Sequence, residues 1–338
     1  MAFQSGGIHG YNQVSHGQLM AALKFKDDAV ECLKSINLPE DELLNVADYG
    51  CSEGYNSLVT FSEIFTEFRK HKNNPITITH TDLPQNNWTE VNRLIVESEK
   101  SYLNLGNIFY STIGRSFFNQ ILPKDSVHFA YSSFAMHYLS VKPPRDEGEY
   151  GWAFHNAKSQ GYKDMKHLLN IRLDELIAGG YLVMVIFGRE NENEDPSFSR
   201  FSFHTIKELL DRGEILPEEF KYYVWHSYPY HASEIKEILQ EFESRVDVVK
   251  CEYGKSLFPY YAEYIETGDF DVYEKNIVDM MRVMMKNALF TSLKRSEEEK
   301  IQLLDKAIDE VKLSLRNNQQ PLYQDYLTVI IRKKPLIV

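Results

Sequence analysis

Val46-Ala-Asp-Tyr-Gly-Cys-Ser-Glu-Gly-Tyr-Asn-Ser57 is the stretch around which the rest of the chain is interpreted. The mostly apolar segment 43–47 predicts a short buried strand, and Asn56 begins a segment with helical spacing of its apolar residues. Between them lies a turn that contains two glycines, Gly50 and Gly54. A strand, a glycine turn and a helix N-terminus in this order predict a cradle for a nucleotide-like ligand. Because glycines also serve ordinary tight turns, this stretch alone does not identify the ligand.

The composition is that of a globular protein that can bury a sizeable core. Of its 338 residues, 43% are hydrophobic and 13% are aromatic. The formal net charge of -12 argues against nucleic acid or an anionic membrane as a partner. Three cysteines without a CxxC pair fit a reduced intracellular protein and provide no metal site. Since neither a signal peptide nor an apolar run of membrane-spanning length is found, we expect a soluble, cytoplasmic protein.

Hydrophobic periodicity predicts strands and helices that alternate along the first half of the chain. Strands are expected at 76–81, 108–110, 126–131 and 181–187, and helices at 18–33, 56–70 and 162–177. This alternation predicts an α/β fold with a mostly parallel, doubly wound sheet that binds ligands at the carboxyl ends of its strands. Later segments are expected to be helical at 201–215, 232–243 and 271–316 and extended at 246–253 and 326–332.

Two parts of the fold are predicted from this pattern. Long helical excursions between strands often form lids, so the later helices are expected to cap the active site. The Rossmann-like core is assigned to residues 1–140, 162–190, 245–254 and 324–338. The mainly helical, substrate-binding cap is assigned to residues 141–161, 191–244 and 255–323.

Carboxylates follow the first two predicted strands, at Asp48 and Asp82. A carboxylate at the end of the second strand is placed to accept hydrogen bonds from two ribose hydroxyls, which serves NAD and S-adenosylmethionine equally. The glycine turn lacks the GxGxxG spacing that a pyrophosphate needs. Asp48 would repel phosphates but could hold an ammonium group, which favours S-adenosylmethionine. Alternatively, both carboxylates cap a turn or a helix.

Seven sequence blocks follow one another in a fixed order. After the opening stretch come TDLPQNN at 81–87, GRSFF at 114–118, ILP at 121–123, VHFAYSSFAMHYLS at 127–140, AGGYLVM at 178–184 and VIIRK at 329–333. Together they resemble the SABATH methyltransferases, known from plants as salicylate, benzoate, jasmonate and caffeine-pathway enzymes. The corresponding family blocks include IADLGCSSGPN, NDLPGNDF and LHFIHSSYSLMWLS. The resemblance covers nearly the whole chain.

The resemblance implies a class I methyltransferase core with a mostly parallel seven-stranded sheet and S-adenosylmethionine as its cofactor. By position in the family motifs, Asp82 and Leu83 would hold ribose and adenine, and Asp48 would lie at the methionine end. The full set of cofactor-binding residues implied in this way is Tyr11, Ser15, Asp48, Gly50, Asn56, Asp82, Leu83, Ser116, Phe117 and Ser132. Val14 replaces the asparagine that the family has near its N-terminus.

The substrate positions depart further from the family. Gln18 would donate its amide to the substrate carboxylate, and the hydroxyl of Tyr138 would replace a family tryptophan that makes a second such bond. His137 precedes it where methionine is common, and is either a substrate contact or a structural histidine. The pocket walls implied by the resemblance are Phe134, Tyr228, Met281, Met284 and Tyr323. A methionine cluster on a helix is otherwise ordinary core packing.

The main functional hypothesis is an enzyme that transfers a methyl group to a small apolar or aromatic carboxylic acid. Because a carboxylate is already ionised at neutral pH, direct in-line transfer requires no general base. An N-methyltransferase acting on a small heterocycle is the nearest alternative. A dinucleotide-dependent oxidoreductase and a cofactor-binding protein without catalysis are further alternatives, the former disfavoured by the missing GxGxxG. The resemblance also implies a homodimer, while the identity of the methyl acceptor stays open.

Overall fold

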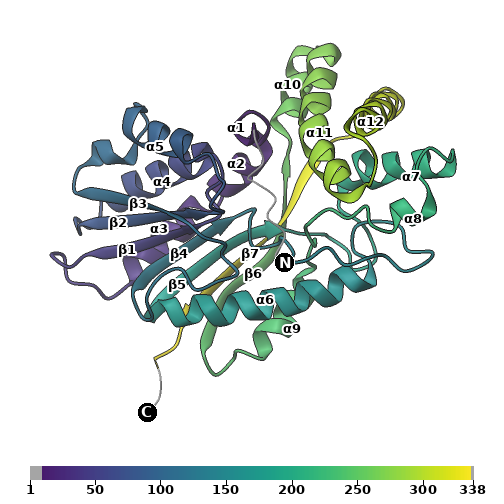
Figure 1. Cartoon of the computed structure of the whole chain (residues 1–338). Coiled ribbons are helices and arrows are strands. Elements are labelled where there is room, and N and C mark those ends of the chain that lie inside the picture. The colour runs from purple at the N-terminus through teal and green to yellow at the C-terminus, as the bar shows by residue number, and fades with distance from the viewer. Residues whose placement is uncertain (1–9, 336–338) are drawn as a thin grey trace.

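A seven-stranded sheet forms the centre of the computed structural model, which describes residues 10–335 (Figure 1). The strand order is β3-β2-β1-β4-β5-β7-β6. β7 is antiparallel to β5 and β6, and the other pairings are parallel, so the expected mostly parallel sheet is confirmed. The strands are β1 (Leu44–Tyr49), β2 (Ile76–Asp82), β3 (Ile108–Gly114), β4 (Val127–Ser133), β5 (Leu176–Phe187), β6 (Val246–Leu257) and β7 (Tyr323–Lys333).

Alternating side chains bury both faces of this sheet. In β1, Val46 packs into an apolar cluster with helices on one face, whereas Ala47 belongs to a cluster on the other face. The first face is covered by α3 (Lys26–Ser35), α4 (Tyr55–Phe68) and α5 (Trp88–Glu97). The second face is covered by α6 (His155–Glu175) and α9 (Ala232–Gln240), which lie together on one side of the sheet in Figure 1.

A third apolar cluster lies apart from the sheet, among the helices grouped at the upper right of Figure 1. These helices are α7 (Phe203–Asp211), α8 (Pro217–Phe220), α10 (Pro259–Thr267), α11 (Phe270–Ser292) and α12 (Glu297–Asn317). Two short N-terminal helices, α1 (Tyr11–Val14) and α2 (His16–Leu23), link the two parts. α1 contacts α11, and α2 contacts both α4 and β6. The N-terminal segment therefore lies between the strand ends and the cap.

Three predicted elements differ from the structure for local reasons. The expected helix at 18–33 is broken at Lys24 and Phe25 into α2 and α3. The expected helix at 271–316 is divided into α11 and α12, because Ser296 forms a capping box with Glu299 and starts a new helix. Gly179 and Gly180, which follow the helix expected at 162–177, lie inside β5, where Gly179 has a φ of 80° and the pairing with β4 shifts register.

The proposed division into core and cap stays a prediction. α6 is one continuous helix from His155, so it crosses the expected boundary between residues 161 and 162. α9 belongs to the cluster on the sheet, although its residues were assigned to the cap. The ends of the assigned core at residues 1–9 and 336–338 lie outside the described residues, as does the segment on which the signal-peptide expectation rests.

Candidate functional site

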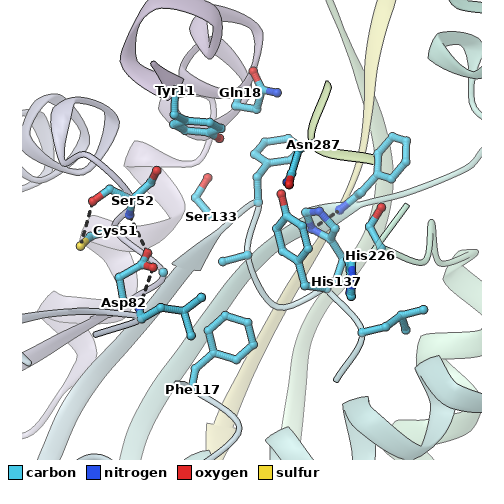
Figure 2. Close-up of a pocket in the computed structure, with 18 of the residues that line it drawn as sticks. Tyr11, Gln18, Cys51, Ser52, Asp82, Phe117, Ser133, His137, His226 and Asn287 are labelled. Carbon is cyan, nitrogen blue, oxygen red and sulfur yellow. Dashed lines mark hydrogen bonds between the residues drawn. The ribbon is translucent and has the colours of Figure 1, made fainter. Parts of the chain in front are cut away.

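A cavity of about 450 Å³ opens where the order of the strands in the sheet reverses, between β1 and β4. Ligands of open α/β sheets bind at such a switch point, outside the carboxyl ends of the strands. Figure 2 shows Ser52, Asp82 and Phe117 on one side of the cavity and His137, His226 and Asn287 on the other, with Tyr11 and Gln18 above. We name the first side the strand-end half and the second the cap half.

Asp82 ends β2 and lines the strand-end half with both carboxylate oxygens anchored. Its Oδ2 accepts a hydrogen bond from the backbone N–H of Ser52 at 2.8 Å, and Oδ1 accepts one from Leu83 at 2.7 Å (Figure 2). Burial raises the pKa of this carboxyl, while the two backbone donors act in the opposite direction. Each oxygen keeps capacity for one further donor, so the group can receive two hydroxyls from a ligand.

Asp48, at the end of β1, is held by a buried chain of polar side chains. Its Oδ2 lies 2.8 Å from Nδ1 of His80, and Nε2 of the same imidazole lies 2.8 Å from the hydroxyl of Tyr102. Asp48 and His80 are only 2% and 1% exposed. Because both ring nitrogens have fixed partners, His80 sets the position of the carboxylate beside the cavity.

The glycine turn after β1 passes so close to Ala135 that there is no room for a side chain at Gly50. Gly50 has a φ of 89°, and a Cβ added there would collide with the Cβ of Ala135. The same turn anchors the N-terminal segment, since Glu53 accepts hydrogen bonds from the backbone N–H groups of Gly10 and Asn12, both at 3.1 Å. Asn56 donates to the carbonyl of Ser15 at 3.2 Å. The turn thus holds α1 above the cavity.

Phe117 lies below Asp82 on a loop that is fixed from the opposite face of the sheet (Figure 2). Arg172 of α6, which is fully buried, donates to the carbonyls of Phe117 at 3.1 Å and Asn119 at 2.9 Å. Its charge is balanced by Glu175 at 2.9 Å, whose carboxylate also accepts from the backbone N–H of Ile121. The buried Arg172–Glu175 ion pair thus fixes the loop and holds the ring of Phe117 at the cavity edge, while neither charge faces the cavity.

Where β4 ends, a backbone turn directs its next residues into the cavity. Phe134 has a φ of 49°, an uncommon value for a bulky side chain and one that clusters at functional sites. His137 then stacks on Tyr138 at 4.8 Å between ring centroids, and its Nδ1 accepts from the backbone N–H of Phe187 at 3.3 Å. Burial lowers the pKa of His137 to about 3, so the imidazole is neutral. Burial and the charge of Asp82 raise the pKa of Tyr138 to about 12, which keeps it a hydrogen-bond donor.

Gln18 contributes an unpaired polar group to the cavity from α2. It is 8% exposed, and its Oε1 is buried without a hydrogen-bond partner. Since a buried amide oxygen or nitrogen normally has a partner, this group is suited to bind a ligand. Tyr11 of α1 lies beside it, and its pKa is raised by burial and by Tyr138 and Asp82. The N-terminal residues thus lie between the two halves.

The cap half has aromatic walls. The ring centroids of Trp152 and Trp225 lie 4.9 Å apart, and the indole N–H of Trp152 donates to the carbonyl of Ser227 at 3.1 Å. The loop that carries Trp225 is tied to the loop after β4, because Leu139 donates from its backbone N–H to the carbonyl of His226 at 2.8 Å. Other apolar lining residues are Val14, Phe187, Phe198, Phe258, Met280, Met284 and Ala288.

Most residues predicted for the site line this single cavity. They are Tyr11, Gln18, Asp48, Gly50, Asn56, Asp82, Leu83, Ser116, Phe117, Phe134, His137, Tyr138 and Met284. Residues that come from the N-terminus, four strand ends and a late helix are therefore brought together. Their individual roles stay predictions, because no ligand is present to show them.

Two predicted cofactor contacts do not line the cavity. In β4, Tyr131 and Ser133 line it, whereas Ser132 points to the other face and donates to the carbonyl of Tyr49 at 2.9 Å. Ser15 is buried at the junction of α1 and α2, and its carbonyl is the group that receives Asn56. These positions correct the expectation of direct contact.

Three predicted wall residues also lie elsewhere. Met281 is one residue from Met280 on α11, so it points about 100° away and packs into the cap core. Tyr228 is fully buried, where its hydroxyl donates to Glu234 at 2.8 Å and accepts from Arg189 at 3.2 Å. Tyr323 begins β7 and lies under the ammonium of Lys255, while its neighbour Gln324 lines the cavity.

Several lining residues of the cap half were missed by sequence reasoning. Lys142, Trp152, His226, Asn287 and Thr291 all contribute to the wall. Only the aromatic loop around residue 226 gave a signal, as a cluster of aromatic residues between helices. The others occur singly in loops or on a helix, where no spacing distinguishes them from ordinary surface residues.

Comparison with known proteins gives consistent results. The family of SAM-dependent carboxyl methyltransferases matches residues 3–333. A salicylate/benzoate carboxyl methyltransferase of Arabidopsis thaliana is 26% identical over 253 residues, which cover 68% of this chain and 66% of that protein. A 3,7-dimethylxanthine N-methyltransferase of Coffea arabica is 25% identical over 282 residues, covering 73% and 72%. The matches to the salicylate/benzoate relatives thus span just under two thirds of those proteins' length.

A solved structure shares the fold. Loganic acid methyltransferase with SAH superposes with a TM-score of 0.76 at 19% identity, covering 96% of each chain. The expected family and fold class are thereby confirmed, and with the family comes S-adenosylmethionine as cofactor. Within residues 10–335, no helix combines the length and apolar character needed to cross a bilayer. In the same range, no group of three or more His, Cys, Asp or Glu side chains is arranged to hold a metal ion.

Proposed function

The chain belongs to the SABATH family of SAM-dependent carboxyl methyltransferases, and we propose that it forms the methyl ester of a small apolar or aromatic carboxylic acid. One observation carries the proposal. A single cavity joins the Asp82 carboxylate to aromatic walls, with the amide of Gln18 and the hydroxyl of Tyr138 among its lining groups. Such a cavity can place a cofactor and an acid side by side.

The strand-end half fits S-adenosylmethionine by the chemistry of its groups. Asp82 keeps acceptor capacity for two ribose hydroxyls, and Leu83 and Phe117 offer apolar surface for adenine. Asp48 supplies a negative charge suited to an ammonium group, and Asn56, in the first turn of α4, lines the same cavity. Two carboxylates at one site would repel a pyrophosphate, which speaks against a dinucleotide.

When bound, S-adenosylmethionine supplies a methyl group on a positively charged sulfur, open to direct attack by a carboxylate oxygen without transfer of a proton. The protein's contribution is to orient and desolvate the acid. Gln18 and Tyr138 would donate hydrogen bonds to its carboxylate, since Tyr138 stays protonated at neutral pH. Trp152 and Trp225 exclude water around it. Positioning of this kind can contribute roughly 7–11 kcal/mol to the rate.

The state of His137 favours an acid over a protonated ring nitrogen as acceptor. With a pKa lowered to about 3, this imidazole is a weak base and would accept a substrate proton poorly. One of its nitrogens is already engaged by the N–H of Phe187. A carboxylate has no proton to lose, so it suits a site without an effective base.

A methyl-transfer screen tests the proposal. Purified protein is incubated with methyl-labelled S-adenosylmethionine and panels of small acids and heterocycles, and base-labile label marks esters. Ester formation with an aromatic or apolar acid is the expected result, whereas base-stable label on a heterocycle would establish the N-methyl alternative. No transfer to any acceptor, despite cofactor binding, would favour a protein without catalysis.

Gln18→Ala tests the carboxylate role within the same assay. We expect kcat/KM for the acid to fall about 30-fold, equivalent to roughly 2 kcal/mol, with cofactor affinity unchanged. Gln324→Ala is a matched control, because Gln324 also lines the cavity and its amide donates within its own strand. Undiminished methylation by Gln18→Ala would show that this amide does not bind the acid.

Two further expectations concern the whole protein. We infer a homodimer from the family alone. From the composition and net charge we infer a cytoplasmic protein that acts on a small-molecule acid and binds no nucleic acid. Light scattering at defined mass tests the first point, and a monomer at micromolar concentration would contradict it.

A further inference from the structure

We propose that the acid accepted by this site carries a second anionic group, which Lys142 binds at the far end of the cap half; this inference rests on the proposed methyl transfer to a carboxylate. The product would be a half-ester that keeps one free carboxylate. The lining of the cavity, the contacts of Lys142 and its neighbours carry the argument.

Charge is divided between the two halves of the cavity. Its formally charged lining residues are Asp48, Asp82, Arg115 and Lys142. The two carboxylates belong to the strand-end half, and Arg115 follows β3 with its side chain exposed. Lys142 is the cation among the aromatic walls of the cap half, within the residues that the structure describes. An anionic ligand group is thus repelled at one end and attracted at the other.

The ammonium of Lys142 is partly desolvated and held in place by hydroxyls. Nζ donates to Oγ1 of Thr291 at 2.6 Å and to Oγ of Ser292 at 3.2 Å. Burial lowers its pKa to about 8, which shows that this environment disfavours the charged form. With a pKa of about 8 the ammonium is still mostly charged at pH 7, and the desolvation already incurred would strengthen an ion pair with an arriving carboxylate.

Neighbouring side chains complete a polar end to an otherwise apolar chamber. His226 lines the same wall, and burial together with the charge of Lys142 lowers its pKa to about 3. A neutral imidazole can donate one hydrogen bond to an anion. Asn287 and Thr291 lie one turn apart on the cavity face of α11. Three separate segments thus bring Lys142, His226 and Asn287 to the wall of one cavity, and each of these side chains can donate a hydrogen bond to a carboxylate.

A structural role is the alternative. Lys142 lies at the C-terminal end of α11, where a cation is favoured by the helix dipole and by last-turn hydroxyls. In that case its charge would stabilise the helix and would not affect the choice of acid. The two roles differ in their effect on substrate ratios, which a measurement of folding stability alone would not reveal.

The test compares acids that differ only at the far end. Benzoate, 4-carbamoylbenzoate and benzene-1,4-dicarboxylate form one series, and the corresponding cinnamates form a longer one. For the wild type we expect kcat/KM for the diacid of the better-fitting series to exceed that of its neutral amide about 10- to 100-fold. Lys142→Met should reduce this ratio to near one, while Lys142→Arg should retain it.

Lys286→Met is the matched control, since Lys286 is exposed on the same helix and contacts the ring of Phe290. Melting temperatures establish that each variant is folded. A wild type without preference for any diacid, or a preference that survives Lys142→Met, would overturn the inference. A lower melting temperature of Lys142→Met with unchanged substrate ratios would assign the residue to helix capping and likewise overturn it.

Calorimetric titration with the same acids, in the presence of S-adenosylhomocysteine, separates this inference from the proposed function. Diacid binding that weakens about 10-fold or more in Lys142→Met supports the inference even if no ester forms. Conversely, ester formation together with a diacid preference and a diacid affinity that are both unchanged in Lys142→Met supports the proposed function and contradicts the inference.

Discussion

The strand-end half and the cap half of the cavity are built in different ways. In the first, both carboxylates have fixed partners: Asp82 takes two backbone N–H groups, and Asp48 is held by His80. In the second, aromatic rings pack on one another, and polar groups such as His226 and Asn287 come from separate segments. The comparison teaches that the strand-end half is fixed by the sheet, whereas the cap half can vary with the cap.

The largest effect is expected from Asp82→Ala. Loss of a charged acceptor for two hydroxyls, at about 2 kcal/mol each, should weaken S-adenosylhomocysteine binding about a thousandfold. Isothermal titration calorimetry measures this change, with the exposed Asp247→Ala as a matched control. If the halves are independent, KM for the acid at saturating cofactor should change less than about threefold. Unchanged cofactor affinity would contradict the assigned role of Asp82.

His80→Leu should destabilise the fold from within the strand-end half. It leaves the buried carboxylate of Asp48 and the hydroxyl of Tyr102 without partners, which we expect to cost roughly 3 kcal/mol in the free energy of unfolding. Urea denaturation measures the change. Tyr102→Phe removes only the outer member of the chain and should cost about 1 kcal/mol. Equal losses for the two variants would show that His80 does not position Asp48.

In the cap half, the buried imidazole of His137 should make the free energy of unfolding depend on pH. Its pKa in the folded state is about 3, below the usual value of 6.5, so the unfolded state binds more protons as the pH falls. The stability contributed by neutral His137 is complete above pH 6.5 and is lost at about 1.4 kcal/mol per pH unit below it.

His137→Asn tests this linkage, because its amide oxygen can replace Nδ1 as acceptor for Phe187. Urea denaturation of both proteins between pH 7 and 5 should show the wild type losing stability faster than the variant. Parallel curves would mean that His137 titrates normally and is more accessible than its 6% exposure indicates.

The smallest effect is expected from Tyr228→Phe. Since its hydroxyl bonds Glu234 and Arg189 outside the cavity, its loss should lower the free energy of unfolding by about 1 kcal/mol. Turnover and KM should stay within about twofold of the wild type. Thermal unfolding and steady-state rates measure the two quantities. A large rise in the KM of the acid would indicate that Tyr228 contacts the substrate after all, as the resemblance implies.

Local signals account for most of what could be predicted. Each strand end and the glycine turn is defined by a few consecutive residues, so Asp48, Gly50 and Asp82 were located correctly beside one cavity. Prediction was weaker where a shift of one residue along a strand or helix turns the side chain away from the cavity. Ser132 in β4 and Met281 in α11 are the examples. A register that moves a side chain to the opposite face is set by pairing and packing, which the motif does not contain.

By itself, the sequence determined the family, the succession of strands along the chain and the carboxylates at the strand ends, because these depend on short-range patterns and on backbone hydrogen bonding. Only the tertiary structure decided that Lys142, His226 and Asn287 share one wall, since they come from segments far apart in the chain. Likewise, nothing local couples His80 to Asp48; parallel pairing of β1 with β2 places them side by side. Long-range contacts are set by how the elements pack, and no short stretch of the sequence contains them.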